Sequence, residues 1–129
     1  MMSLLKKYWL SSLVVLTILV LCFMNTEPLP EVPVKDFDKL VHIIMFGGLS
    51  GVVFFDNTRY LRFPVSRLRI LLGSFLFPVA LGGLIEIGQT YLTVTRNGDW
   101  FDFLGNIVGA VLGIGIIFLI NTLLERKKQ

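Results

Sequence analysis

Ionisable and amide side chains occur at helical spacing inside otherwise apolar stretches of the chain. The pairs are three or four residues apart and comprise Asp38 with His42, Glu86 with Gln89, and Asp102 with Asn106. At this spacing both members of a pair lie on one face of a helix. An imidazole, carboxylates and amides can exchange protons, hydrogen-bond a polar headgroup or ligate a metal ion. These residues are therefore candidates for a functional site.

The types of these residues do not identify one particular ligand or reaction. One histidine among carboxylates is a weak zinc signature. Oxygen atoms of Asp38, Glu86 and Asp102 would suit a divalent ion. However, the sequence alone favours no metal and no cofactor, and no nucleophile motif identifies a catalytic residue. Structural roles stay open as well, including helix capping for Asp38 and Asp99 and headgroup contacts for Lys39 and Arg96.

The elements that must position these residues are apolar segments. Of the 129 residues, 54% are hydrophobic, and the mean hydropathy is +0.76. A helix needs about 20 residues to cross a hydrocarbon core about 30 Å thick. The segments at about 8–24, 38–55, 70–92 and 100–124 predict an all-α bundle of four transmembrane helices, of which the first two are short. The chain 1–129 would then be a single membrane domain, with its motifs between 38 and 109.

Basic residues gather at three places, namely Lys6 and Lys7, then Arg59, Arg62, Arg67 and Arg69, and finally Arg126, Lys127 and Lys128. The positive-inside rule therefore predicts that both termini are cytoplasmic and that the loops near 25–38 and 93–100 face outward. The net charge of +3 reflects these orientation signals, and we expect no nucleic-acid binding. The single cysteine, Cys22, excludes an internal disulfide.

Helical rise places the polar groups at one depth. With about 1.5 Å per residue, His42 lies about 6 Å and Glu86 about 9 Å inside the outer boundary. Asp102 and Asn106 would be shallow in the same leaflet. We expect the second helix to end at Asp56-Asn57-Thr58 and the inner halves of the spans to be dry. Glycines four residues apart, which are Gly47 and Gly51, and Gly105, Gly109 and Gly113, predict close helix packing within the bundle.

Three motifs together resemble the VanZ-like family. They are Asp38-Lys39-x-x-His42 followed by Phe46-Gly47, Glu86-x-x-Gln89, and Arg96-x-x-Asp99-x-x-Asp102-x-x-x-Asn106-x-x-Gly109. The resemblance implies a small multi-pass protein of the bacterial inner membrane and cell envelope. The founding member of the family is associated with low-level resistance to teicoplanin. The family has no established common mechanism, so the resemblance implies a setting rather than a reaction.

The candidate site residues are Asp38, Lys39, His42, Glu86, Gln89, Arg96, Asp99, Asp102 and Asn106. The first hypothesis is an outer-leaflet site that binds a lipid headgroup or a lipid-linked glycan precursor and thereby influences glycopeptide susceptibility. The alternatives are an enzyme acting on a lipid-linked phosphate or sugar, and a small proton-coupled transporter using Glu86. We expect membrane lipids or lipid-linked envelope precursors as partners, and assembly into a homo-oligomer stays open.

Overall fold

The computed structural model describes residues 3–24, 37–60, 67–92 and 100–128. Within these ranges the chain is almost entirely helical and has no strand, as the sequence predicted. The elements in chain order are α1 (Leu4–Lys7), α2 (Trp9–Phe23), α3 (Phe37–Tyr60), α4 (Arg67–Leu92) and α5 (Trp100–Lys127).

Three of the helices are long and apolar enough to cross a membrane. Their apolar windows are Lys39–Thr58, Leu68–Leu92 and Trp100–Lys127, of 20, 25 and 28 residues. Helix α2 has 15 residues, which corresponds to a length of about 22 Å. That length is below the typical hydrocarbon thickness of about 30 Å. The long apolar helices therefore indicate a membrane protein, whereas a fourth span and the orientation of the termini stay predictions.

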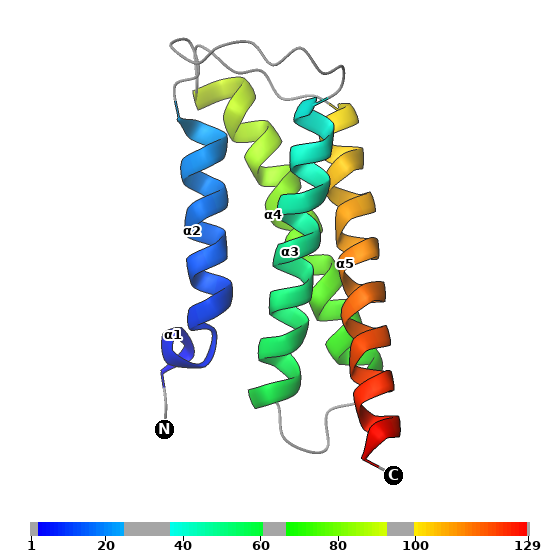
Figure 1. Ribbon diagram of the computed structural model, residues 1–129. Helices are drawn as coiled ribbons and strands as arrows, with labels where there is room; N and C mark the ends of the chain where they lie inside the picture. Colours follow the sequence, from blue (N-terminus) through cyan, green and yellow to red (C-terminus); the bar gives the residue numbers. More distant parts are fainter. Residues whose placement is uncertain (1–2, 25–36, 61–66, 93–99, 129) are drawn as a thin grey trace.

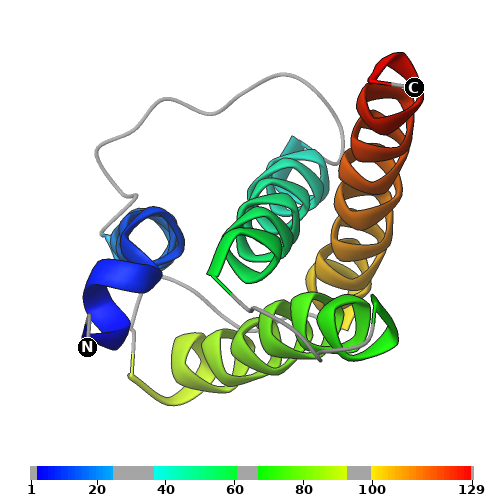
Figure 2. The ribbon, with the colours of Figure 1, turned by 90° about the horizontal axis from the view of Figure 1, so that it is seen from below.

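The helices run alternately up and down, so that α1 and the C-terminal end of α5 lie at the same end of the bundle (Figure 1). Seen along the bundle, α3 lies between α2 and α5, and α4 packs beside them (Figure 2). Helix α3 contacts α2, α4 and α5. We call the end that contains the start of α3 the His42 end, and the end that contains its last turns the Asp56 end.

The contact between α3 and α5 depends on glycine. A Cβ atom on Gly109 would collide with the carbonyl oxygen of Ile43, and one on Gly113 with that of Gly47. A Cβ atom on Gly47 would in turn lie 3.0 Å from the carbonyl oxygen of Gly109. The two backbones can approach this closely only because these positions carry no side chain. The predicted packing role of these glycines within the bundle is therefore confirmed.

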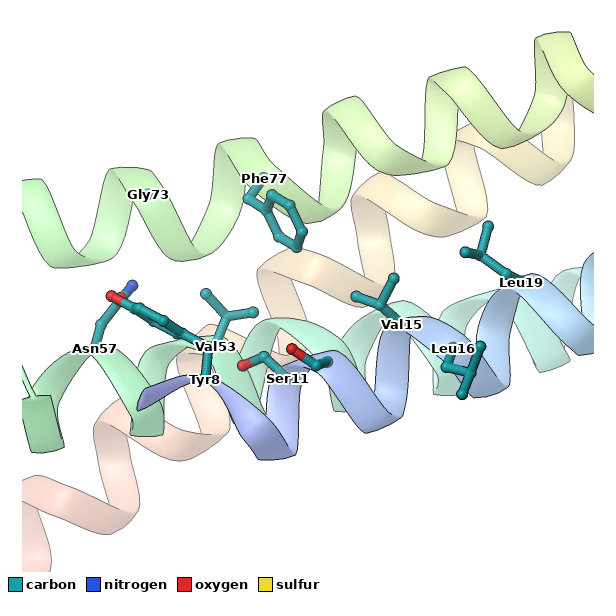
Figure 3. Close-up of a pocket in the computed structure, with 10 residues that line it drawn as sticks. Tyr8, Ser11, Val15, Leu16, Leu19, Val53, Asn57, Gly73 and Phe77 are labelled. Carbon is teal, nitrogen blue, oxygen red and sulfur yellow. The ribbon is translucent and has the colours of Figure 1, made fainter. Parts of the chain in front are cut away.

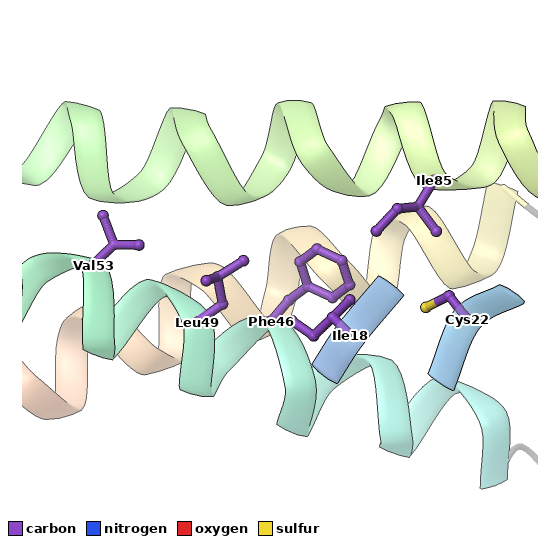
Figure 4. Close-up of a cluster of buried hydrophobic side chains, with 6 residues drawn as sticks. All are labelled: Ile18, Cys22, Phe46, Leu49, Val53 and Ile85. Atoms are coloured by element: carbon purple, nitrogen blue, oxygen red, sulfur yellow. The ribbon is translucent and has the colours of Figure 1, made fainter. Parts of the chain in front are cut away.

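A small apolar core joins α2, α3 and α4 (Figure 4). It consists of Ile18, Cys22, Phe46, Leu49, Val53 and Ile85. Many other large apolar side chains are exposed, including Leu13, Ile44, Leu84 and Ile116. Exposed apolar surface on this scale is expected where lipid takes the place of water around a bundle.

Two expectations about α3 and the inner halves of the spans are wrong. Helix α3 does not end at Asp56-Asn57-Thr58 but continues to Tyr60. Asp56 and Asn57 are buried inside the bundle. Oδ2 of Asp56 and the side chain of Asn57 form hydrogen bonds to neighbouring helices, whereas Oδ1 of Asp56 has no hydrogen-bond partner among the described residues. The half of the bundle toward the Asp56 end, which the positive-inside rule predicts to be the inner half, is therefore not wholly apolar, since it also buries Ser11, Ser50 and Ser74.

Candidate membrane-embedded polar site

His42 is the centre of a polar cluster near the His42 end. The side chain is almost completely buried, with 4% of the residue exposed. Its Nδ1 atom lies 2.7 Å from Oδ1 of Asn106 on α5. A carbonyl oxygen can only accept, so Nδ1 carries the proton and donates to Asn106. The hydrogen bond joins α3 to α5 where Gly105 lets the helices approach, its ideal Cβ position lying 3.6 Å from Cβ of His42.

Two carboxylates from different helices flank the imidazole ring. Oε1 of Glu86 on α4 lies 3.8 Å from Nδ1, and Oδ2 of Asp102 on α5 lies 3.8 Å from Nε2. Both separations exceed the distance of a direct hydrogen bond and leave room for a bridging atom. All three long helices thus contribute an ionisable group to one small volume.

Packing fixes the orientation of the His42–Asn106 pair. The His42 ring is parallel to that of Phe46, with 6.3 Å between centroids and 3° between planes. Asn106 is fully buried, and Gly82 of α4 makes room for it, because a Cβ atom there would lie 2.7 Å from Nδ2 of Asn106. The sequence alone did not identify Gly82 as part of the site. The only feature that could have indicated it is the position of this glycine one turn before Glu86.

The cluster opens sideways between α4 and α5. Glu86 also belongs to the wall of a cavity of about 310 Å³. The cavity is lined by Gly83, Glu86, Ile87, Thr90, Tyr91, Trp100 and Phe103. Trp100 and Phe103 meet edge to face at 6.0 Å, and Tyr91 and Trp100 are largely exposed. Exposed tryptophan and tyrosine are typical of the boundary between membrane and water.

Gln89 does not join the cluster, although it lies one turn from Glu86. Its amide nitrogen donates to the carbonyl oxygen of Cys22 at 2.9 Å. Cys22 lies in the last turn of α2, where carbonyl groups lack partners within the helix. The side chain of Gln89 therefore ties α4 to the end of α2. This contact supports a structural role for Gln89.

The remaining predicted residues lie around the cluster or beyond the described chain. Nζ of Lys39, in the turn before His42, lies 5.8 Å from the centroid of the Phe101 ring, a distance suited to a cation–π contact. The side chain of Asp38, together with Arg96 and Asp99, lies outside the described residues. Of the nine candidates, the structure brings together His42, Glu86, Asp102 and Asn106.

A second polar cluster, which the sequence reasoning missed, lies toward the Asp56 end. Oδ2 of Asp56 accepts from the backbone nitrogen of Ser11 at 3.1 Å and from its hydroxyl at 2.7 Å. Asn57 accepts from the Tyr8 hydroxyl at 2.9 Å and donates to the Ser74 hydroxyl at 3.0 Å. Serines within the apolar segments are the feature of the sequence that could have indicated this cluster. Their positions face Asp56 and Asn57 only once the helices are packed.

This second cluster borders a larger cavity of about 610 Å³. In Figure 3 Tyr8, Ser11 and Asn57 lie toward one end of the cavity, whereas Leu19 lies toward the other. The lining is therefore polar at the Asp56 end and apolar farther along α2. Among the described residues, no carboxylate or histidine lines this cavity, whereas the cluster around His42 combines an imidazole with two carboxylates.

Comparison with known protein families supports the resemblance noted in the sequence. The family model described as VanZ/LLP1 matches residues 2–121, which is nearly the whole chain. Neither the curated proteins nor the solved structures give a significant match. The match includes the motifs from Asp38 to Gly109 and the apolar helices that carry them. The chain therefore belongs to the VanZ/LLP1 family of membrane proteins.

Proposed function

We propose that this protein binds the headgroup of a membrane lipid or of a lipid-linked envelope precursor at the cluster around His42. The observation that carries the proposal is the position of Glu86. Its carboxylate lies 3.8 Å from His42 in the buried cluster and also lines the aromatic cavity between α4 and α5. A polar group that enters from the membrane can therefore reach the cluster without crossing the bundle.

The cavity has the properties of a small amphipathic site. Its volume of about 310 Å³ is at the lower end of the range of about 300–1,000 Å³ for small-molecule pockets. Aromatic walls with few polar groups are typical of such pockets. Hydrocarbon attached to a bound headgroup would continue along the exposed apolar residues Leu84, Ile87, Leu104 and Val108. This arrangement favours a headgroup with a lipid tail over a free water-soluble ligand.

The polar groups of the cluster differ in their surroundings. His42 and Asn106 contact one another, whereas Glu86 also lines the cavity, where its carboxylate could accept a hydrogen bond from a hydroxyl or amine of a ligand. Lys39, near the same end, and the predicted contribution of Arg96 would supply positive charge for a phosphate. The shared chemistry of the ligand is thus a hydroxyl- or amine-bearing headgroup attached to a lipid phosphate.

The biological setting follows from orientation. If both termini are cytoplasmic, as the basic residues predict, the His42 end faces the outer side of the bacterial cell membrane. A lipid-linked precursor held there would be less accessible to teicoplanin, which would alter susceptibility. We therefore place any effect on glycopeptide resistance downstream of headgroup binding.

Native mass spectrometry of the purified protein tests this proposal directly. One arm uses phospholipid mixtures and the other a polyprenyl-linked saccharide, so that the two lipid sources are distinguished. We expect the wild-type protein to retain one of these lipids and Glu86→Gln to lose it. Glu125→Gln, on an exposed residue near the end of α5, is the matched control and should retain the lipid.

Equal retention by wild-type protein and both variants would contradict the proposal. Conversion of the bound lipid to a product during incubation would instead support the enzymatic alternative. Flux of substrate into proteoliposomes that depends on Glu86 would support the transporter. In cells, expression of wild-type protein should change the teicoplanin susceptibility of a sensitive strain, and Glu86→Gln should abolish the change.

A further inference from the structure

Three groups that commonly bind metal ions meet at the His42 end. His42, Glu86 and Asp102 each offer one ligand atom, and these atoms all lie within 4.8 Å of one another. The residues come from α3, α4 and α5, so the grouping is formed by the fold and not by local sequence. We propose that these three residues bind a divalent transition-metal ion, of which Zn²⁺ and Mn²⁺ are the best candidates.

The hydrogen bond to Asn106 prepares His42 for this role. Because Nδ1 donates to Oδ1 of Asn106 at 2.7 Å, the lone pair of the neutral ring lies on Nε2. A histidine that ligates a metal almost always donates its other N–H group to an oxygen atom, which sets the tautomer and the orientation of the ring. Asn106 supplies that oxygen here. Nε2 makes no hydrogen bond within the described part of the chain and faces Asp102.

The separations agree with an ion between the side chains. Zinc bonds to nitrogen and oxygen are about 2.0–2.2 Å long, so two ligand atoms of one ion lie about 4 Å apart or less. Nε2 of His42 and Oδ2 of Asp102 are 3.8 Å apart. Glu86 lies nearer to Nδ1 and has to rotate toward Nε2. The adjoining cavity, which Glu86 already lines, provides space for this movement.

Charge and ligand type narrow the choice of ion. Two carboxylates and a neutral imidazole match the charge of a divalent ion, and a neutral cluster is favourable at membrane depth. The nitrogen ligand favours transition metals over Ca²⁺ and Mg²⁺, which prefer oxygen alone. Three protein ligands leave at least one coordination position open, as in zinc sites that bind a further molecule.

Asn106 offers a second contact to whatever occupies the open position. Its amide nitrogen is buried and has no hydrogen-bond partner among residues 3–24, 37–60, 67–92 and 100–128. It can therefore donate to an oxygen atom of metal-bound water or of a ligand. If the proposed headgroup binding is correct, and only then, the ion would bridge the two carboxylates to the phosphate of the lipid.

The first experiment uses the metal alone. Full-length protein in detergent is treated with EDTA, dialysed against Zn²⁺ or Mn²⁺, and analysed for bound metal by mass spectrometry. We expect one ion per chain for the wild-type protein and loss of stoichiometric binding for Asp102→Asn. The matched control is Asp56→Asn, which alters a buried carboxylate at the opposite end of the bundle and should retain the ion.

A folding defect is separated from ligand loss by two further measurements. Circular dichroism should give the same helical signal for Asp102→Asn as for wild-type protein. Co²⁺ in place of Zn²⁺ should give a visible absorption band in wild-type protein and in Asp56→Asn, and a reduced or shifted band in Asp102→Asn. The absence of bound metal in wild-type protein, or equal binding by both variants, would overturn the proposal.

The lipid-retention experiment then distinguishes the metal site from the proposed headgroup binding, on which the bridging of the lipid phosphate depends. Retention of lipid by metal-free protein would remove the bridging role and leave headgroup binding intact. Metal binding by protein that retains no lipid would contradict the proposed function and leave the metal site standing. Metal-dependent lipid retention is the result that we expect.

Discussion

The carboxylate of Asp56 caps the first turn of α2 by accepting hydrogen bonds from both the backbone nitrogen and the hydroxyl of Ser11. The first N–H groups of a helix have no partner within it, and an acidic side chain there is favourable. At the other end of α2, Gln89 donates to the carbonyl of Cys22. Side chains of α3 and α4 thus hold a short helix at both ends.

Loss of the Asp56 cap should destabilise the bundle. We expect Asp56→Ala to lower the free energy of unfolding by about 1–2 kcal/mol, the usual effect of removing a helix cap. Asp56→Asn keeps an oxygen acceptor and should be milder. Thermal unfolding in detergent, followed by circular dichroism, measures the difference in Tm. Equal Tm values for Asp56→Ala and wild-type protein would show that the contact contributes nothing.

The contact between Gln89 and Cys22 can be tested with a reporter that the chain already contains. Cys22 is the only cysteine and is 1% exposed, so its thiol should react slowly with a maleimide in the folded protein. Gln89→Leu removes a hydrogen bond of about 1 kcal/mol and should let the last turn of α2 open, which accelerates labelling. Thr122→Val, which removes an exposed hydrogen bond within α5, should label at the wild-type rate.

Replacement of Gly113, at the contact between α3 and α5, by a residue with a side chain should destabilise the bundle. Because the new Cβ would meet the Gly47 carbonyl, we expect Gly113→Ala to cost about 1–3 kcal/mol by overpacking. Gly115 lies two residues farther along the same helix and has open space at its Cβ position. Gly115→Ala should therefore be neutral or slightly stabilising. Comparison of the two Tm values provides the test, and similar values would argue against tight packing at Gly113.

Tryptophan fluorescence can report occupation of the aromatic cavity. The chain has two tryptophans, and Trp100 lines the cavity beside Glu86. In a Trp9→Phe background, addition of the retained lipid should shift the emission of Trp100. With Trp100→Phe, the emission of Trp9 should not respond. A shift that persists after Glu86→Gln would place the lipid away from the cluster.

The sequence predicted the helices that bring the His42 cluster together. The depth of each polar residue follows from the rise of the helix, and the helix face on which it lies follows from the residue spacing. His42, Glu86, Asp102 and Asn106 accordingly meet, although their function stays a proposal. The direction of Gln89 could not be predicted, since its partner is a backbone carbonyl of α2. Polar residues after an apolar run resemble a helix cap, so the sequence predicts a helix end at Asp56 and Asn57. Their burial depends on Ser11, Tyr8 and Ser74, which only tertiary packing brings near.

The glycine contacts between α3 and α5 have a mechanical consequence. Two helices whose backbones touch cannot slide or separate without losing contact along their length, so they behave as a rigid pair. Glu86 belongs to α4, which Gln89 links to α2. Any movement that widens the entrance beside Glu86 must therefore displace α4 from that pair. Such a movement would strain α2, which Gln89 links to α4 and Asp56 links to α3.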